Sequence, residues 1–166
     1  WAKHIGATVI GTVGSEEKAA LAKAHGCDHT INYRTEDFQK CLIEITDGQG
    51  VPVVYDSIGK DTFESSLDCL QPRGLMVTYG NATGPVKDVD LSILAGKGSL
   101  YVTRPTLMGY NALRPDHEKS AADLMALVAN GTIKINIGQR YHLSEAAKAH
   151  EDLEGRKTTG STIFTL

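Results

Sequence analysis

The stretch VIGTVGSEEKAALAKAHG, from Val9 to Gly26, holds the pattern that decides the fold. The apolar, β-branched residues 7–13 predict a strand. Ser15 is a good helix N-cap, and the alanine-rich residues that follow predict a helix that ends at Gly26. The stretch therefore predicts a strand that leads directly into a helix.

The same alternation continues toward Pro105. Thr35 and Asp61 have the side chains of helix caps, and Phe38, Leu42 and Ile45 form one apolar helix face. We expect helices over 35–46, 61–70 and 90–94, and strands over 29–32, 51–59, 74–84 (with its loop) and 98–105. The strand over 51–59 is nearly all apolar, which is typical of burial on both faces. Alternating strands and helices with short connections predict a doubly wound α/β fold with a parallel sheet.

The regular alternation of short strands and helices ends after Pro105. A long helix is expected over 116–131, then a strand, a helix capped by Ser144 and a final strand. We expect a boundary near 108–115, which gives a domain over 1–110 and a second segment over 111–166. Residues 1–6 have the pattern of a helix end with a glycine cap, so we expect a fragment of a longer protein.

Composition limits the classes of function. The chain has 166 residues, of which 41% are hydrophobic and 22% charged, with a net charge of −3. These values are typical of a soluble globular protein. The negative charge without clustered Lys and Arg argues against nucleic-acid binding. No apolar run reaches 18 residues, so we expect no membrane span.

Cysteine and histidine spacing predicts neither a disulfide framework nor a metal site. Cys27, Cys41 and Cys69 are far apart, and we interpret them as small buried hydrophobic residues in a reducing cytoplasm. A thiol nucleophile or a metal ligand is the alternative. The histidines show no ligand spacing, and His142 and His150 have no partner that spacing can identify.

Candidate ligand contacts follow the predicted strands, because ligands of doubly wound sheets bind at the carboxyl ends of the strands. Small, polar and glycine residues recur there and let a flat cofactor approach the backbone. These strand-end segments are residues 12–18, 32–34, 56–59, 79–84 and 103–105.

The residues after the first strand favour NADP over NAD. An NAD site has an acid at the equivalent strand end, whereas an NADP site accommodates a 2′-phosphate. Here Gly14 and Ser15 end the strand, Lys18 adds positive charge, and Tyr33 and Arg34 could close the site. An N-cap with solvated charges explains the same residues, and Glu16 and Glu17 count against a phosphate unless they point away.

The other strand ends are less specific. Ser57 is either a turn residue or a ligand contact, and Gly80-Asn81 is a turn signal by itself. Asp56 could be buried and paired, and we assign it no catalytic role. We name no catalytic side chain in this chain.

Taken together, these residues resemble the C-terminal half of the zeta-crystallin-like NADPH:quinone oxidoreductases, of the medium-chain dehydrogenase/reductase superfamily. The matching pieces include WAKHIGATVIGTVGSEEKAALAKAHG, VVYDSIGKDTFESSLDCLQPRGLMVTYGNATGPV, GSLYVTRPTLMGY and HEDLEGRKTTGSTIFTL, and together they cover nearly the whole chain. The resemblance implies a Rossmann cofactor domain and a GroES-like catalytic domain, to which residues 111–166 return.

The resemblance also implies roles for particular residues. Gly14, Ser15, Lys18 and Tyr33 would hold the 2′-phosphate and adenosine side of NADPH, and Ser57, Gly80 and Asn81 would line the cofactor groove. Val102 and Thr103 would approach the nicotinamide, and Arg156 would reach the cofactor from the returning segment. Residues Gly98–Thr103 would form an edge strand that pairs with its copy in a homodimer. No metal is expected in this branch of the superfamily.

One departure from the family is large. Its glycine-rich phosphate loop, the preceding first strand of the sheet and the N-terminal catalytic domain are expected outside this sequence. In the strand order 3-2-1-4-5-6 the missing strand is central, so we expect an unpaired gap in the sheet. Alone, this polypeptide is expected to bind NADPH weakly and to reduce nothing.

Several functions remain open at this point. The primary hypothesis is hydride transfer from NADPH to a quinone or a related electrophilic small molecule. A 2-alkenal or enoyl reductase of the same superfamily is the neighbouring alternative. A crystallin-like or nucleotide-binding role without catalysis is a second class. A methyltransferase-like domain would usually need an acid after the strand, where Gly14-Ser15 stands.

Overall fold

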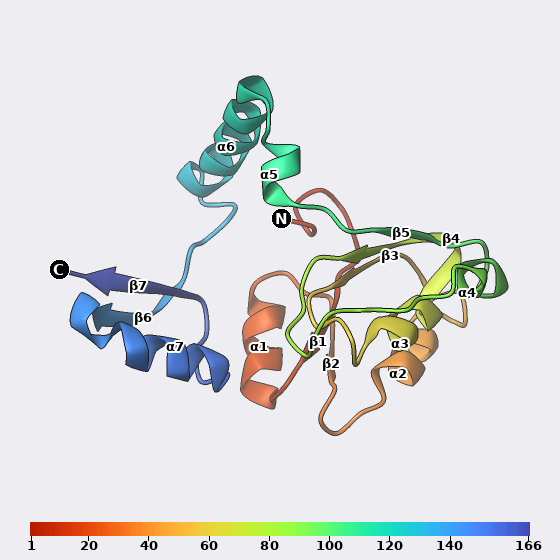
Figure 1. The fold of residues 1–166 in the computed structure, drawn as a ribbon. Helices are drawn as coiled ribbons and strands as arrows, with labels where there is room; N and C mark the ends of the chain where they lie inside the picture. The colour runs from red at the N-terminus through yellow and green to blue at the C-terminus, as the bar shows by residue number, and fades with distance from the viewer. The chain divides into compact units, whose positions relative to one another are not determined.

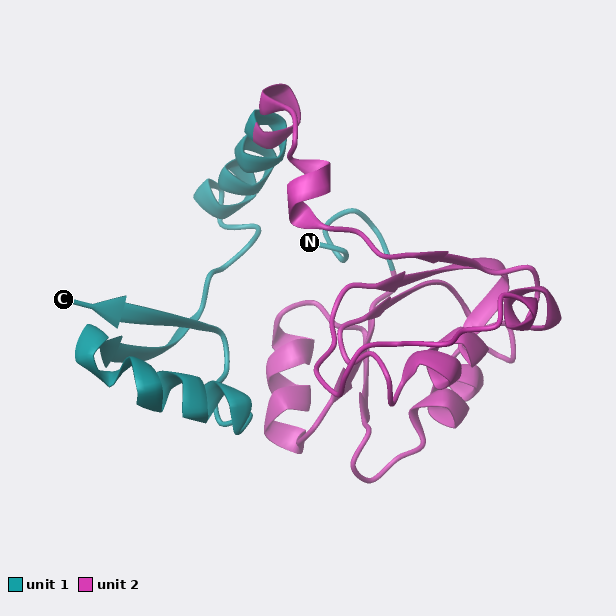
Figure 2. Cartoon of the chain, in the orientation of Figure 1, with its two compact units in different colours: residues 1–7, 118–166 teal, residues 8–117 magenta.

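The computed structural model describes residues 1–166, which divide into two compact units (Figure 2). One unit is residues 8–117, and the other combines residues 1–7 with residues 118–166. No helix in the structure has both the length and the apolar character needed to cross a membrane.

The unit of residues 8–117 alternates strands and helices (Figure 1). Every strand pair in it is parallel, which confirms the predicted α/β fold. In chain order its elements are β1 (Ile10–Val13), α1 (Glu16–Ala24), β2 (His29–Asn32), α2 (Phe38–Ile45), β3 (Val51–Asp56), α3 (Phe63–Asp68), β4 (Leu70–Thr78), α4 (Ser92–Gly96), β5 (Tyr101–Thr103) and α5 (Leu107–Tyr110).

The strands form two separate sheets. β1 pairs with β2, and β3, β4 and β5 form a second sheet in that order, with no pairing between β1 and β3. The gap expected from the strand order 3-2-1-4-5-6 is therefore present between β1 and β3. β4 lies between β3 and β5, and β5 is an edge strand.

Two apolar clusters hold this unit together. One gathers Phe63, Leu67, Leu70, Met76 and Leu100, so α3 and the region before β5 cover β4. The other centres on Ile31, Leu42 and Cys69, and it draws in residues from both sheets. The predicted apolar face of α2 is confirmed, because Phe38 and Ile45 pack on this second cluster beside buried Leu42.

Two predicted caps are wrong. Thr35 bonds back to the carbonyl of Asn32, so α2 begins later, with the Asp37 carboxylate accepting hydrogen bonds from the Gln39 and Lys40 amides. Asp61 does not cap α3 either, because the residue before the helix is Thr62, whose hydroxyl donates to Asp56 instead.

Strand β3 is not buried on both faces as its apolar sequence predicts. Tyr55 is 73% exposed and Val53 is 38% exposed, whereas Val54 packs on both apolar clusters. The two faces of this strand therefore differ, and an apolar run alone does not reveal which face is covered.

The other unit includes the N-terminus, where residues 1–6 form a turn instead of the expected end of a helix. Even so, the Ala7 amide bonds to the Ala2 carbonyl, and Gly6 has a φ of +90°. This is the hydrogen bonding of a helix end with a glycine cap. The remaining elements are α6 (Arg114–Ala129), β6 (Ile137–His142), the short 3-10 helix η1 (Leu143–Glu145), α7 (Ala146–Glu154) and β7 (Ser161–Thr165). β6 and β7 pair in parallel.

The predicted cap Ser144 is also wrong. The His142 ring accepts a hydrogen bond from the Ser144 amide, and the Glu145 carboxylate accepts one from the His142 amide. His142 therefore caps the 3-10 helix, and α7 starts only at Ala146.

Candidate functional site

The end of β1 brings together four of the predicted cofactor contacts. The Ser15 hydroxyl caps α1 by accepting a hydrogen bond from the Lys18 amide at 3.3 Å. The Tyr33 ring lies against Gly14, since a Cβ on Gly14 would stand 2.6 Å from the Tyr33 hydroxyl oxygen and 3.6 Å from Nε of Arg34. Residues 33 and 34, after β2, thus lie beside the end of β1.

Two acidic residues near the end of β1 are held by hydrogen bonds from Asn32. Oε1 of Glu16 accepts a hydrogen bond from the side-chain amide of buried Asn32 at 2.8 Å. Glu36 accepts from the Asn32 backbone amide at 2.7 Å, and Glu17 is exposed. Glu16 is therefore held by β2 and is not extended over Ser15.

The loops after β3 and β4 fit closely against each other. A Cβ on Gly80 would overlap the carbonyl group of Ser57, and the Ala82 amide donates to the Ser57 carbonyl at 3.3 Å. Gly59 has a φ of +93°, and a Cβ there would lie 3.3 Å from Cα of Asn81. The predicted residues Ser57, Gly80 and Asn81 thus lie together at the ends of two neighbouring strands.

Asp56 organises the first of these loops. Its Oδ1 accepts from the Ile58 and Gly59 amides at 2.7 and 3.0 Å, and its Oδ2 accepts from the Thr62 and Ser66 hydroxyls at 2.6 and 2.8 Å. Burial by itself raises the pKa of Asp56, but these four hydrogen bonds outweigh it and leave the pKa below its ordinary value. Asp56 is thus buried and fully hydrogen-bonded, as the sequence suggested, and its ionised form is favoured.

Arg104 lies in the strand-end segment 103–105, but the sequence does not indicate its hydrogen-bond partners. Nη1 of this exposed side chain donates to the Gly80 carbonyl at 3.0 Å and to the Thr78 hydroxyl at 3.3 Å. It joins the end of β5, where the predicted contacts Val102 and Thr103 lie, to the loop after β4. Its position directly after a strand was the only signal in the sequence that marked it.

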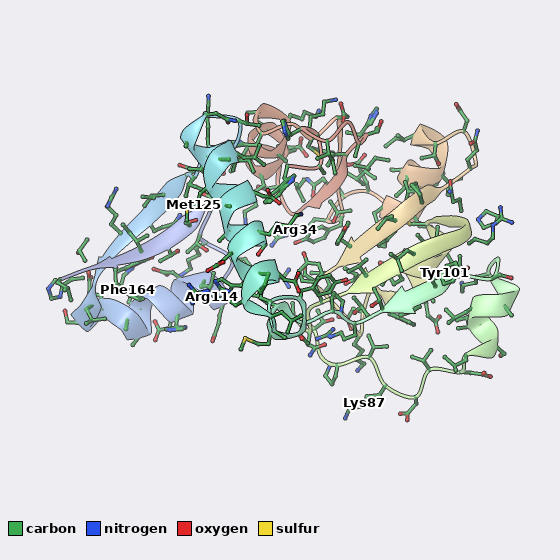
Figure 3. The ribbon with its side chains drawn as sticks, turned by 90° about the horizontal axis from the view of Figure 1, so that it is seen from above. Arg34, Lys87, Tyr101, Arg114, Met125 and Phe164 are labelled. Carbon is green, nitrogen blue, oxygen red and sulfur yellow. The ribbon has the colours of Figure 1, made fainter.

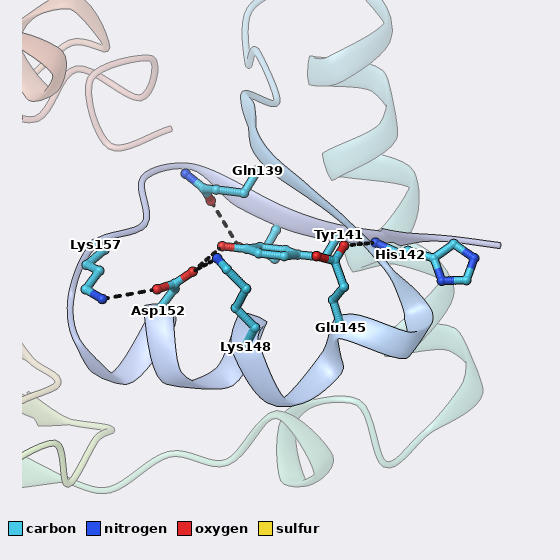
Figure 4. Close-up of polar contacts among 8 residues, drawn as sticks. Gln139, Tyr141, His142, Glu145, Lys148, Asp152 and Lys157 are labelled. Carbon is cyan, nitrogen blue, oxygen red and sulfur yellow. Dashed lines mark hydrogen bonds and ion pairs between the residues drawn. The ribbon is translucent and has the colours of Figure 1, made fainter.

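Arg156 lies in the other unit, after α7, with a φ of +57°. Next to it, Asp152 accepts hydrogen bonds from the Tyr141 hydroxyl and from the ammonium groups of Lys148 and Lys157 (Figure 4). The bond from Lys148 is the strongest of these influences, and together they lower the pKa of Asp152 to about 2. The predicted contact of Arg156 with a cofactor stays a prediction.

The three cysteines differ in how far they are buried. Cys69 is buried, which raises the pKa of its thiol to about 12. Cys27 and Cys41 are only partly buried, so the expectation of buried thiols holds for one of the three. Cys27 donates to the His29 carbonyl at 2.9 Å.

A model of the zinc-binding dehydrogenase family matches residues 1–129. The chain belongs to this family. It is 54% identical to a quinone oxidoreductase of Pseudomonas aeruginosa over 99% of this chain and 50% of that protein. It is 48% identical to a 2-haloacrylate reductase of Burkholderia over 99% of this chain and 50% of that protein. The chain thus spans about half the length of these relatives.

A solved structure of a quinone oxidoreductase has the same fold as this chain. A crystal structure of Escherichia coli quinone oxidoreductase complexed with NADPH superposes on it with a TM-score of 0.97 at 51% identity. The superposition covers 100% of this chain and 52% of the Escherichia coli chain. The predicted relation to the quinone oxidoreductases is confirmed. Although the family is named for zinc, no group of three or more His, Cys, Asp or Glu side chains in this chain could hold a metal ion.

Proposed function

We propose that this chain is the cofactor-binding part of an NADPH-dependent oxidoreductase that reduces a quinone. Its likeness to a quinone oxidoreductase that was crystallised with NADPH supports this proposal. Bound NADPH supplies the hydride, and the residues of the chain bind and orient the cofactor. The cofactor grooves of related folds lie at the carboxyl ends of the strands, where the close loop packing described above occurs.

The observation that carries the proposal is the set of residues that lie together at the end of β1. A 2′-phosphate needs hydrogen-bond donors and positive charge, and a carboxylate there would repel it. Ser15, the first amides of α1 and the Lys18 ammonium group can meet this need. Tyr33 and Arg34 border the same corner. The carboxylate that directly follows Ser15 in the chain, that of Glu16, accepts a hydrogen bond from the Asn32 side chain.

The remaining contacts extend the proposal along the sheet. Ser57, Gly80 and Asn81 line the groove, Val102 and Thr103 approach the nicotinamide, and Arg156 adds a contact from the segment 111–166. We assign no acid to the reduction, because the reduced quinone oxygen can take its proton from water or a hydroxyl group. Asp56 does not serve, since its hydrogen bonds favour the ionised form.

We further propose that the protein is a cytoplasmic homodimer. Strand β5 has only one neighbour in its sheet, and Tyr101 on it is 61% exposed. An edge strand with an exposed apolar side chain is suited to pairing with a second copy. Three free cysteines fit a reducing compartment.

A fluorescence titration of the intact protein with NADPH and with NADH tests the cofactor assignment. Lys18→Ala should raise the Kd for NADPH about tenfold, the effect of losing one charged hydrogen-bond donor, and leave NADH binding unchanged. Lys23→Ala, in the last turn of the same helix, is the matched control. Equal affinity for both cofactors, or an unchanged preference in Lys18→Ala, would contradict the proposal.

Reduction of an electron-poor alkene is the second candidate function, because a 2-haloacrylate reductase matches the chain almost as closely as the quinone oxidoreductases do. A 2-alkenal or enoyl substrate belongs to the same class of reaction. Comparing kcat/KM for a quinone, a 2-alkenal and a 2-haloacrylate at saturating NADPH distinguishes the two. A higher value for either alkene would replace the quinone assignment.

A further inference from the structure

Asn32 is a polar residue buried at the end of β2. It is 8% exposed, and in the parallel pair of β1 and β2 it lies opposite Val13, the residue before Gly14. A buried side-chain amide needs hydrogen-bond partners. Oδ1 of Asn32 accepts from the Arg34 amide at 3.2 Å, and Nδ2 donates to Oε1 of Glu16 at 2.8 Å. The side chain therefore joins the residues after β2 to the first turn of α1.

The backbone of Asn32 is held on both sides. Its amide donates to Oε2 of Glu36 at 2.7 Å. Its carbonyl accepts from the Thr35 and Glu36 amides at 3.0 and 2.9 Å. Because the backbone donor and acceptor are both satisfied, the place from which the Asn32 side chain reaches Glu16 is fixed by the turn after β2.

Glu16 places a negative charge at the start of α1. It is the first residue of this helix and directly follows Ser15, whose hydroxyl accepts a hydrogen bond from the Lys18 amide. The helix dipole favours an acid in this turn, but it favours a phosphate at the same helix end as well. A carboxylate and a phosphate at one helix end repel each other. The hydrogen bond from Asn32 directs the carboxylate toward β2.

We propose that Asn32 is a positioning residue for cofactor specificity, which holds the Glu16 carboxylate away from the 2′-phosphate of NADPH. This inference rests on the proposed function, which puts that phosphate at the end of β1. In an NAD site, an acid at this strand end accepts a hydrogen bond from the ribose 2′-hydroxyl. Here an acid stands one residue after Ser15 and is bonded to β2 instead. Specificity between two cofactors that differ by one phosphate depends on where repelling charges are held, as well as on attracting groups.

The test compares the NADPH and NADH affinities of the intact protein with those of three variants in the first turn of α1. Glu16→Asp keeps the negative charge but shortens the side chain, so that it no longer reaches Asn32. It should raise the Kd for NADPH about fivefold and leave the Kd for NADH unchanged. Glu16→Gln removes the charge and keeps an acceptor for Asn32, so both Kd values should stay within about twofold of the original. Glu17→Asp, at the exposed neighbouring residue, is the matched control and should change neither.

Variants at Asn32 separate the position of the charge from folding. Asn32→Ala removes the donor and should raise the Kd for NADPH about fivefold. Adding Glu16→Gln should reverse this rise, because the released side chain is then uncharged. The Tm should stay lowered in the double variant, since the buried amide is still missing. If Asn32→Ala does not fold, Glu16→Asp decides by itself, because Glu16 is exposed. High salt should reduce the effect of Glu16→Asp, because the repulsion is electrostatic.

A preference for NADPH over NADH that is unchanged in Glu16→Asp would overturn the inference, whereas loss of that preference in Lys18→Ala would still uphold the proposed function. Equal rises of both Kd values in Glu16→Asp would also overturn it, because the variant would then act on the fold of the helix end. Equal affinity of the unaltered protein for both cofactors would instead overturn the proposed function, and this inference with it.

Discussion

The guanidinium of Arg104 donates a hydrogen bond to the carbonyl oxygen of Gly80 at 3.0 Å. It thereby ties the end of β5 to the loop after β4, two segments assigned to the cofactor groove. Arg104→Ala should release this loop and raise the Kd for NADPH about three- to tenfold, because a charged hydrogen bond to an exposed partner contributes about 1 kcal/mol. The titration used for Lys18 measures this effect.

Lys87→Ala is the matched control for that variant. Lys87 lies on the exposed segment between β4 and α4 (Figure 3) and carries a charge of the same sign. Its removal should leave the affinity unchanged. If both variants weaken NADPH equally, the effect of Arg104 is one of net charge and not of loop position.

Gly80 should tolerate no side chain. A Cβ would overlap the Ser57 carbonyl group, so the two loops would have to separate, and Gly80→Ala should lower the free energy of unfolding by about 2 kcal/mol or more. Gly96→Ala is the control, because a Cβ at the end of α4 meets nothing within 4 Å. Urea unfolding measures both, and equal stabilities of the two variants would refute the close packing.

The ionised Asp56 makes stability depend on pH. Its pKa in the folded protein lies below the ordinary value of 3.8, so the unfolded chain takes up the proton first as the pH falls. The stabilisation is therefore complete above about pH 5 and is lost as the pH falls through the folded pKa. Asp56→Asn should lower the free energy of unfolding at pH 7 by about 2 kcal/mol, with a smaller deficit near pH 3.

Urea unfolding of both proteins at each pH checks this prediction. A deficit that stays constant from pH 7 to pH 3 would mean that the charge of Asp56 contributes nothing beyond its shape. The exposed Asp90 offers a comparison, since the pKa of this carboxyl is also lowered, mainly by a hydrogen bond from the Ser92 amide. Asp90→Asn should have little effect on stability at either pH, because an exposed group is screened by solvent.

The proposed dimer depends on the edge of β5. Tyr101 lies on this strand at the edge of the sheet (Figure 3). Tyr101→Lys should shift the intact protein from dimer to monomer, because two-fold pairing brings like charges together. Light scattering after size exclusion measures the mass. Tyr110→Lys, at a side chain 72% exposed outside β5, should leave the dimer intact.

The sequence predicted the order of elements well because local signals determine it. Strand β2 has the predicted bounds, and Ser15 caps α1 as expected. The cap of α2 was mispredicted because the Thr35 hydroxyl bonds back to the Asn32 carbonyl, three residues earlier. The cap of α3 was mispredicted because the helix starts one residue later than Asp61 allows, after Thr62, whose hydroxyl donates to Asp56. A capping motif shows which residues can cap a helix, but not which competing acceptor a side chain will meet.

The site was predictable in kind but not in its supporting contacts. Gly14, Ser15 and Tyr33 were predicted as cofactor contacts because ligands bind at the strand ends of this fold, and the structure places the three residues close together. The links made by Arg104 and Asp152 cross between elements, and no spacing rule connects their partners. The pairing of Glu16 with Asn32 likewise depends on the register of β1 and β2, in which Val13 lies opposite Asn32.

Strand β4 is flanked by a strand on each side, whereas β1, β2, β3 and β5 each have one paired edge. Its residues Met76, Val77 and Thr78 are also buried. Their amide hydrogens should therefore exchange with solvent deuterium only when this unit opens as a whole, and the rate at Met76 would report its global unfolding. Amides on the unpaired sides of β1 and β3 should exchange through local fluctuations, long before those of β4.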